Sequence, residues 1–332
     1  MKKTILSLFV ALMATVAVQA QQISVVAEDG TTTFLYHTLQ EAIEGASPNS
    51  VIYLPGGGFA ISDDVKINKK LTIIGIGYDA KNDNVDGITT INGNLFFDEG
   101  SDGSAVMGCY IASRYGGKIV IGNSETAVNN VVIKYCNVYS VEVVNSNSTG
   151  TIINQNYIRS SSYYRGAQVT ITNNVIGGQI RQVGAGEVSY NTFCYYGRYS
   201  SSSWAETLYE VSATVIGNIF RASDVVYIHY GCNCDFFGNF YIGGSFGDDP
   251  IIIDATEEDI FQNINEWKVT PASDFHFKEA YKDYESKVGI YAGTGFSKKG
   301  MAPVPYIVAK QVAEQTDASG NLNIKIRVSA GE

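Results

Sequence analysis

Two segments rich in tyrosine, residues 160–166 and 195–204, combine side chains that proteins commonly use to bind sugars. Each segment places tyrosines near an arginine within a run of serine and glycine. A tyrosine ring offers an apolar face with a polar tip, and a nearby arginine can bind a carboxylate or hydroxyl group of a glycan. The residues predicted to bind carbohydrate are Tyr163, Tyr164, Arg165, Tyr195, Tyr196, Arg198, Tyr199 and Trp204. The alternative is that these rings fold back and cover the edge of the fold.

Arginines in the middle of the chain indicate a second chemistry, the cleavage of an acidic polysaccharide by elimination. A lyase needs a group that neutralises the uronate carboxylate, a base that removes the C5 proton, and donors that stabilise the developing negative charge. The candidate arginines are Arg159, Arg165, Arg181, Arg198 and Arg221. No matching cluster of aspartates accompanies them. The catalytic residues of this alternative are therefore unknown, and the sequence favours a protein that is not an enzyme.

The sequence predicts no metal site and no cofactor, with calcium kept as an alternative. Residues 82–87 match three positions of a calcium-binding EF-hand loop but lack its first aspartate and its final glutamate. A second acidic loop, residues 98–103, could also hold a cation. Of the five cysteines, Cys232 and Cys234 form a close pair, which supplies too few ligands for zinc. Most of the cysteines are expected to fill small spaces in the core.

The first twenty residues have the pattern of a signal peptide. Lys2 and Lys3 precede an apolar run, and the small residues Val18 and Ala20 mark a cleavage site, so the mature chain should begin at Gln21. The protein is therefore predicted to be exported to the periplasm, the cell surface or the extracellular space. The net charge of -10 becomes -12 when these two lysines are removed, which argues against nucleic acid as a partner. No insertion into a membrane is expected.

Asparagines recur between short apolar strands and set the period of the chain. They are Asn137, Asn156, Asn174, Asn191, Asn218 and Asn239, separated by 19, 18, 17, 27 and 21 residues. About twenty residues provide three short strands and three turns, which is one coil of a parallel β-helix. We expect each asparagine to adopt a positive φ at a corner, with its amide bonded along the helix axis in a ladder. The longest interval contains the inserted segment 195–204.

The two ends of the chain carry signals of a different kind. Thr38 and Glu41 have the spacing of a capping box, and Leu39, Ala42 and Ile43 share one apolar face, so a short helix should cover the first coil. Near the C-terminus, apolar and polar residues alternate and predict the closing strand of a hairpin. The predicted organisation is a signal peptide (1–20), a parallel β-helix with its N-terminal cap (21–300), and a C-terminal hairpin that packs on the solenoid or extends from it (301–332).

Residues 39–57, LQEAIEGASPNSVIYLPGG, followed by residues 67–77, INKKLTIIGIG, resemble the opening of right-handed parallel β-helix proteins of the pectin-lyase-like class. The resemblance covers roughly residues 38–295, and it implies an all-β solenoid. It implies little about activity, because this class holds lyases, hydrolases, adhesins and uncharacterised secreted proteins. Of the four motifs of its polygalacturonase-type hydrolases, only the paired aspartates are matched, by Asp248 and Asp249. The other three are absent, and the order fails because His229 precedes the pair and lacks flanking glycines.

These observations lead to one functional prediction and two alternatives. The predicted protein is an exported, non-catalytic β-helix that binds or organises a poly- or oligosaccharide at the cell surface or in the periplasm. The first alternative is a polysaccharide lyase that acts on an acidic polysaccharide. The second is an adhesive or structural surface protein. The sequence leaves open which glycan is bound and which oligomeric state the protein adopts.

Overall fold

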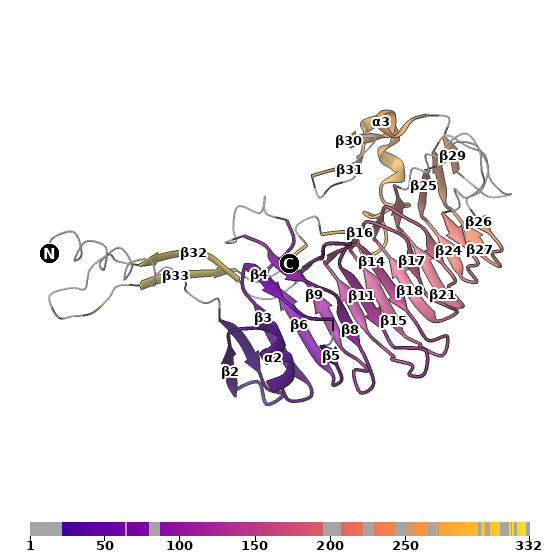
Figure 1. The fold of residues 1–332 in the computed structure, drawn as a ribbon. Coiled ribbons are helices and arrows are strands. Elements are labelled where there is room, and N and C mark those ends of the chain that lie inside the picture. The colour runs from indigo at the N-terminus through magenta and orange to yellow at the C-terminus, as the bar shows by residue number, and fades with distance from the viewer. Residues whose placement is uncertain are drawn as a thin grey trace, which may run out of the picture.

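The computed structural model confirms that the chain forms a parallel β-helix (Figure 1). Three long sheets, almost entirely parallel, run along the molecule, and successive coils of the chain add their strands to all three. The structure describes residues 22–63, 65–79, 87–194, 207–221, 229–242, 251–253, 255–264, 270, 272–297, 300–302, 306–312, 319, 321 and 324–329. The predicted signal peptide, residues 1–20, lies outside this set.

The strands of each sheet follow the order of the coils. The first sheet contains β2 (Thr33–Tyr36), β1 (Ile23–Val26), β3 (Ser50–Leu54), β6 (Leu71–Gly75), β9 (Ala105–Met107), β12 (Val132–Lys134), β15 (Thr151–Asn154), β18 (Gln168–Thr172), β21 (Ala185–Ser189), β24 (Thr214–Ile216) and β27 (Asp235–Phe237). The second sheet contains β4 (Gly57–Ala60), β7 (Thr89–Asn92), β10 (Tyr110–Ala112), β13 (Asn137–Val138), β16 (Tyr157–Ile158), β19 (Val175–Ile176), β22 (Thr192–Phe193), β25 (Ile219–Arg221), β28 (Phe240–Ile242) and β29 (Ile251–Ile253). The third sheet contains β5 (Lys66–Ile67), β8 (Leu95–Phe97), β11 (Lys118–Ile121), β14 (Ser140–Val143), β17 (Ser162–Tyr163), β20 (Ile180–Arg181), β23 (Leu208–Tyr209) and β26 (His229–Tyr230).

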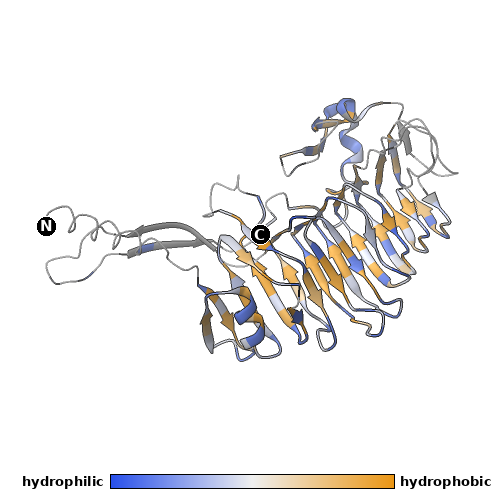
Figure 2. Cartoon of the chain, viewed as in Figure 1, coloured by the Kyte–Doolittle hydropathy of each residue, from blue (hydrophilic) through white to orange (hydrophobic). Residues whose placement is uncertain are grey.

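Inward side chains of successive coils stack in columns and form the core. In the first sheet, Ile133 pairs with Val106 on one side and with Ile153 on the other, and all three are fully buried. In the second sheet, the rings of Phe193 and Phe220 stack with their centroids 4.8 Å apart. Figure 2 shows how apolar residues are concentrated on the strands. Each fully buried side chain of this size contributes about 1.5–3 kcal/mol, so the columns are the main source of stability.

The N-terminal end is covered as the sequence predicts. Helix α2 (Leu39–Gly45) begins after Thr38, whose hydroxyl accepts a hydrogen bond from the Glu41 backbone N–H, and the Glu41 carboxylate accepts one from the Thr38 backbone N–H. This reciprocal pair is the predicted capping box. The apolar face of α2 is buried, and the antiparallel strands β1 and β2 extend the first sheet beside it. The first coil therefore does not present an open edge.

Five of the six predicted asparagines form a continuous ladder. The amide Nδ2 of Asn156 donates to Asn174 Oδ1, Asn174 to Asn191, Asn191 to Asn218, and Asn218 to Asn239, each at 3.0 Å. Each Oδ1 also accepts the backbone N–H of the preceding member at 2.9 Å, and all five side chains are buried. The ladder therefore ties adjacent coils together through side chain and backbone at one corner.

Two details of the ladder differ from the sequence prediction. The position equivalent to Asn156 in the preceding coil is Cys136, whose backbone N–H donates to Asn156 Oδ1 at 2.9 Å, while Asn137 lies one residue further on, in β13. Asn137 is therefore not a member, and its buried Oδ1 has no partner among the described residues. In addition, the positive φ belongs to the residue before each ladder position, such as Asn173 at 53°. The corner and the ladder thus use two adjacent residues.

The C-terminal part of the chain covers the outer face of the second sheet. Tyr157, Val175, Ile219 and Phe240 occupy one outward column of that sheet, and each is nearly or fully buried. The elements near its end are α3 (Glu257–Ile260), β30 (Phe261–Asn263), β31 (Asp274–Phe277) and the 3-10 helix η1 (Glu279–Tyr284). The ring of Phe277 in β31 packs edge-on against Phe240 at 5.7 Å. Figure 1 shows α3, β30 and β31 beside the C-terminal coils.

After η1 the chain runs back along the ladder corner, as a segment that we call the strap (residues 287–297 and 300–302). Its contacts proceed from later coils to earlier ones: Gly289 N–H donates to Gly217 O at 2.7 Å, and Ser297 N–H donates to Gln155 Oε1 at 2.7 Å. Between them, Asn173 Nδ2 donates to the carbonyl oxygens of Ile290 and Ala292. The strap thus bonds to the positive-φ residues of several coils.

The chain ends in the predicted hairpin. Strand β32 (Tyr306–Val312) pairs antiparallel with β33 (Ile324–Ser329), with a register shift between Ile307 and Ala309. Because the strap returns toward the first coils, the hairpin projects from the N-terminal end of the solenoid (Figure 1).

Candidate functional site

The structure places part of the predicted carbohydrate-binding set. Tyr163 and Arg165 are exposed in β17 and in the turn that follows it. Tyr164 is fully buried in the core, because adjacent residues of a strand point to opposite faces, so its ring cannot contact a ligand at the surface as predicted. The remaining members lie outside the described residues: Tyr195, Tyr196, Arg198, Tyr199 and Trp204.

Tyr163 belongs to an outward row on the third sheet that sequence reasoning did not assemble. It pairs in register with Arg181 on β20, Arg181 pairs with Tyr209 on β23, and Tyr209 pairs with Tyr230 on β26. Four consecutive coils therefore place a tyrosine or an arginine at the same outward position. Since neighbouring strands are about 4.8 Å apart, the row extends over roughly 14 Å along the helix axis. We call these four residues the Tyr–Arg row.

The side chains of the Tyr–Arg row stack on one another. The Arg181 guanidinium carbon lies 5.1 Å from the centroid of the Tyr163 ring and 4.2 Å from that of the Tyr209 ring. The rings of Tyr209 and Tyr230 are stacked at 5.4 Å, with an angle of 18° between their planes. Tyr163 is 36% exposed and Tyr230 is 50% exposed, so solvent reaches both ends of the row. Such an array of rings around one cation provides a flat, amphipathic surface.

Arg181 retains hydrogen-bonding capacity in this arrangement. Its Nη1 donates to Gln179 Oε1 at 3.2 Å, while its Nε is buried and has no hydrogen-bond partner among the described residues. Because a guanidinium has four N–H donors on its two Nη atoms, the single contact with Gln179 leaves Nη donors for an anionic or hydroxylated ligand. Arg181 therefore supplies both charge and directional hydrogen bonds to the row.

The hydroxyl group of Tyr209 stays protonated at physiological pH. Partial desolvation, followed by the neighbouring Glu210 carboxylate, raises the pKa of Tyr209 above its ordinary value, and the opposing effect of Arg181 is smaller. Glu210 itself accepts a hydrogen bond from Gln182 Nε2 at 2.9 Å. A neutral phenol can donate and accept hydrogen bonds but is a poor base. This suits recognition of a polar ligand better than removal of a proton.

Charged residues continue the column beyond Tyr163. Glu142 on β14 pairs in register with Tyr163 and accepts a 2.7 Å ion pair from Lys118 Nζ. Further along, the Lys66 ammonium lies 3.7 Å from the centroid of the Phe96 ring. The Tyr–Arg row is therefore bounded by a carboxylate that is already paired, and Arg181 is its only cationic member.

The other arginines predicted as candidates do not join the row in the described structure. Arg159 lies over the ring of Tyr110 at 5.0 Å and donates from Nη2 to the Ile111 carbonyl at 3.2 Å, at the corner between the second and third sheets. Arg165 follows Tyr164 in the turn after β17 and has a positive φ of 45°. Arg198 lies outside the described residues, as does the side chain of Arg221. Among the candidate arginines whose side chains the structure describes, Arg181 alone lies in the row.

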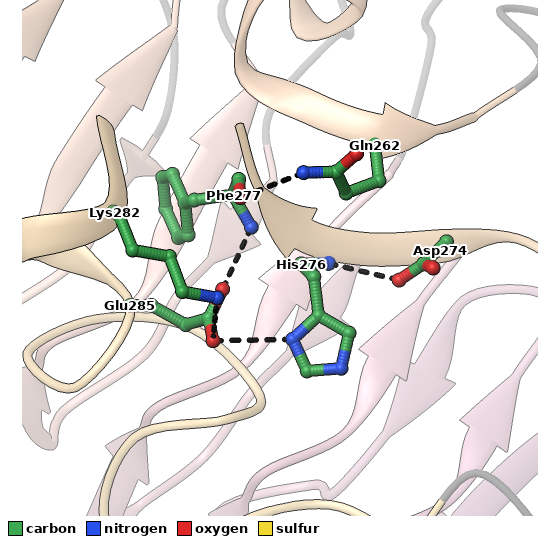
Figure 3. Close-up of polar contacts among 6 residues, drawn as sticks. All are labelled: Gln262, Asp274, His276, Phe277, Lys282 and Glu285. Carbon is green, nitrogen blue, oxygen red and sulfur yellow. Dashed lines mark hydrogen bonds and ion pairs between the residues drawn. The ribbon is translucent and has the colours of Figure 1, made fainter. Parts of the chain in front are cut away.

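A second polar cluster surrounds His276 near the end of the solenoid (Figure 3). The imidazole stacks on the Tyr291 ring at 3.8 Å, and its Nδ1 lies 3.1 Å from Glu285 Oε1. Glu285 also accepts hydrogen bonds from Lys282 Nζ at 2.7 Å and from the Phe277 backbone N–H at 2.8 Å. Both carboxylate oxygens are thus committed to contacts that hold β31 against η1. The contacts of this cluster are therefore structural.

Of the two loops considered for calcium, only residues 98–103 lie within the described structure. Asp98 Oδ1 accepts from Asn123 Nδ2 at 2.7 Å, and Asp102 Oδ1 accepts from the Asn129 N–H at 2.6 Å, so both aspartates bridge to the next coil. Residues 82–86 lie outside the described set. Among the described residues, no group of three or more His, Cys, Asp or Glu side chains is placed to hold a metal ion.

Comparisons with known proteins found no relative of this chain: no known family, curated protein or solved structure gave a significant match. Within the described ranges, no helix has the length and apolar character needed to cross a membrane. The Tyr–Arg row is consequently defined by its own geometry. A signal for it exists in the sequence, because Tyr163, Arg181, Tyr209 and Tyr230 are separated by 18, 28 and 21 residues, which are lengths of the same order as the coils.

Proposed function

We propose that the protein is an exported parallel β-helix of the right-handed, pectin-lyase-like class, and that it binds a glycan without cleaving it. Export rests on the signal-peptide pattern of residues 1–20, and the class rests on the resemblance of residues 38–295. The glycan-binding function rests on the Tyr–Arg row. The proposed binding surface is the outer face of the third sheet.

One observation carries this proposal: four coils in succession place Tyr163, Arg181, Tyr209 and Tyr230 at one outward register position. Because the side chains of the row stack on one another, the rings present their edges and hydroxyl groups to a glycan, and the rigid backbone fixes them at little entropic cost. An extended glycan advances by about one strand spacing with each sugar, so the row offers about three successive contact positions. The guanidinium of Arg181 favours a glycan that carries carboxylate groups.

Glycan-array screening followed by titration calorimetry tests the proposal. Tyr209→Ala removes the ring at the centre of the row and should weaken binding by about 10-fold to 100-fold, as expected for loss of an aromatic anchor. Tyr115→Ala is the matched control, because Tyr115 is 81% exposed and lies between β10 and β11, away from the row. That variant should bind within about twofold of the wild type. Equal loss in both variants, or no binding to any glycan, would refute the assignment.

Arg181→Gln separates the two kinds of ligand. If Arg181 binds carboxylate groups, the variant should lose affinity for acidic glycans and retain it for neutral ones of the same backbone. An equal effect on both classes would show that the guanidinium acts only by stacking between the tyrosines.

The lyase alternative has one structural point in its favour, the position of Arg181 between two tyrosines. The raised pKa of Tyr209 acts against it, because a tyrosine base must reach the deprotonated form. Elimination produces an unsaturated uronate that absorbs in the ultraviolet. We expect no such absorbance on incubation with acidic polysaccharides, with or without calcium; its appearance would replace the binding proposal with catalysis.

A further inference from the structure

Cys232 and Cys234 occupy the corner between β26 and β27, the last coil in which both sheets are described. Both side chains are half-buried and pack against the core. They meet at a single residue of the preceding coil: the Val211 N–H donates to Cys232 Sγ at 3.4 Å, and Cys234 Sγ donates to the Val211 carbonyl oxygen at 3.2 Å. Asn233, between them, is held there too, since its N–H donates to Val211 O at 2.9 Å. The two thiols therefore converge on one side of the chain.

The surroundings make the two thiols unequal. A hydrogen bond from the Cys234 thiol lowers the pKa of Cys232, and backbone groups including the Val211 N–H assist, although burial opposes them. The same contact, with burial, raises the pKa of Cys234. When Cys232 is a thiolate, the Cys234 proton can turn from the Val211 carbonyl to the Cys232 sulfur. This is the arrangement of an attacking thiol beside a resolving thiol.

Cys109 and Cys136 lack these properties. Burial raises the pKa of Cys109 above its ordinary value and raises the pKa of Cys136 to about 12, and both thiols are fully enclosed in the core. Their thiolates are scarce and their sulfurs are out of reach of a solvent-borne reagent. Cys109 and Cys136 should therefore be much less reactive than the half-buried pair.

We propose that Cys232 and Cys234 are a redox-active dithiol, which closes to an intramolecular disulfide by exchange with a disulfide compound. The Cys232 thiolate attacks one sulfur of the external disulfide, forms a mixed disulfide and releases one thiolate. Cys234 then loses its proton and attacks the Cys232 sulfur, which releases the second thiolate. Two protein thiols are oxidised and one external disulfide is reduced to two thiols, so atoms and electrons balance.

The ring that closes contains a single intervening residue, Asn233. Such a small ring constrains the disulfide geometry, and strained disulfides are the readily reduced ones. The pair should therefore cycle instead of serving as a permanent cross-link. Its position is distinct from the Tyr–Arg row but adjacent to it, since Tyr230 precedes Cys232 by two residues and its carbonyl lies 3.6 Å from Cys232 Sγ.

The test uses the folded wild-type protein, treated with oxidised glutathione and then denatured and alkylated, with peptide mass spectrometry as the readout. We expect the peptide with Cys232 and Cys234 to be two hydrogens lighter and unalkylated, and reduced glutathione to restore both labels. Cys109 and Cys136 should be alkylated throughout, which provides an internal control. Alkylation of both Cys232 and Cys234 after oxidation, or a glutathione adduct that persists at Cys232, would overturn the proposal.

Two variants assign the roles. Cys234→Ser should accumulate a stable glutathione adduct on Cys232, because no resolving thiol remains. Cys232→Ser loses the contact that most raises the pKa of Cys234, but burial still raises it, so Cys234 should react in this variant more slowly than Cys232 reacts in Cys234→Ser. The opposite order of reactivity would reverse the roles of attacking and resolving thiol. Far-ultraviolet circular dichroism of both variants confirms that the coil is retained.

Discussion

Replacing Asn174 with alanine should be among the most destabilising single changes in the solenoid. The Asn174 side chain is fully buried. Its Nδ2 donates to Ile153 O at 2.9 Å and to Asn191 Oδ1 at 3.0 Å, while its Oδ1 accepts from the backbone N–H and the Nδ2 of Asn156 at 2.9 and 3.0 Å. Four hydrogen bonds at about 1 kcal/mol each predict a loss of about 3–5 kcal/mol, because buried partners are left unsatisfied.

The matched control is Asn137→Ala. Asn137 is also buried, lies one residue beyond the ladder position and has an Oδ1 without a partner among the described residues. Its replacement should cost less than about 1 kcal/mol, because no satisfied bond of that oxygen is lost. Guanidinium denaturation followed by circular dichroism at the β-sheet band gives both values. If Asn174→Ala costs no more than Asn137→Ala, the ladder contributes no net stability and the reasoning is refuted.

Three other substitutions test the ladder corner and the polar cluster around His276. Cys136→Asn should extend the ladder by one asparagine next to Asn156 and raise the unfolding free energy by about 1 kcal/mol. A lower unfolding free energy in the same denaturation assay would show that this position cannot accommodate an amide side chain. Asn173→Ala should cost more than Asn173→Gly, because both lose the contacts to the strap but only alanine is strained by the positive φ; equal melting temperatures would contradict this. At Glu285, burial is the largest single influence and opposes ionisation, yet hydrogen bonds, first from Lys282, leave the pKa of the carboxyl below its ordinary value. The stabilising effect of the Glu285 carboxylate is therefore present above about pH 4.3 and is lost as the pH falls through the lowered folded-state pKa. Glu285→Gln should consequently make the unfolding free energy less dependent on pH on the acid side. An unchanged pH dependence would show that other groups cause it.

The fold was predictable because successive coils of the solenoid repeat the same local pattern, a short apolar strand followed by an asparagine at a corner. The period of the asparagines gave five of the ladder residues, and the capping box gave the start of α2. Asn137 was misassigned because Cys136 holds the ladder position in its coil and a cysteine carries no asparagine signal. Counting from the positive-φ residue corrects the register: Tyr135 precedes Cys136 just as Gln155 precedes Asn156, with φ values of 53° and 56°.

The site was less accessible to sequence reasoning. Tyr163 was predicted, but which tyrosines accompany it depends on register across coils of unequal length. The residues from Arg181 to Tyr209 include the inserted segment 195–204, so their separation is 28 and a fixed period places the wrong residue beside Arg181. The strap was missed for another reason. Its contacts, such as Asn173 with Ile290, join residues 117 apart through irregular backbone, which leaves no periodic trace.

The strap also has a consequence for the order of assembly during synthesis. Each coil meets a finished neighbour as it emerges, whereas residues 287–302 are made only after every coil they contact. Until then, Tyr157 and Ile219 in the outward column of the second sheet lack the cover that the strap provides. A nascent or truncated chain that stops near residue 242 would display this apolar stripe to solvent, which makes it a target for chaperones and a site of self-association. The strap thus buries part of the outer face of the second sheet, which the coils alone leave exposed.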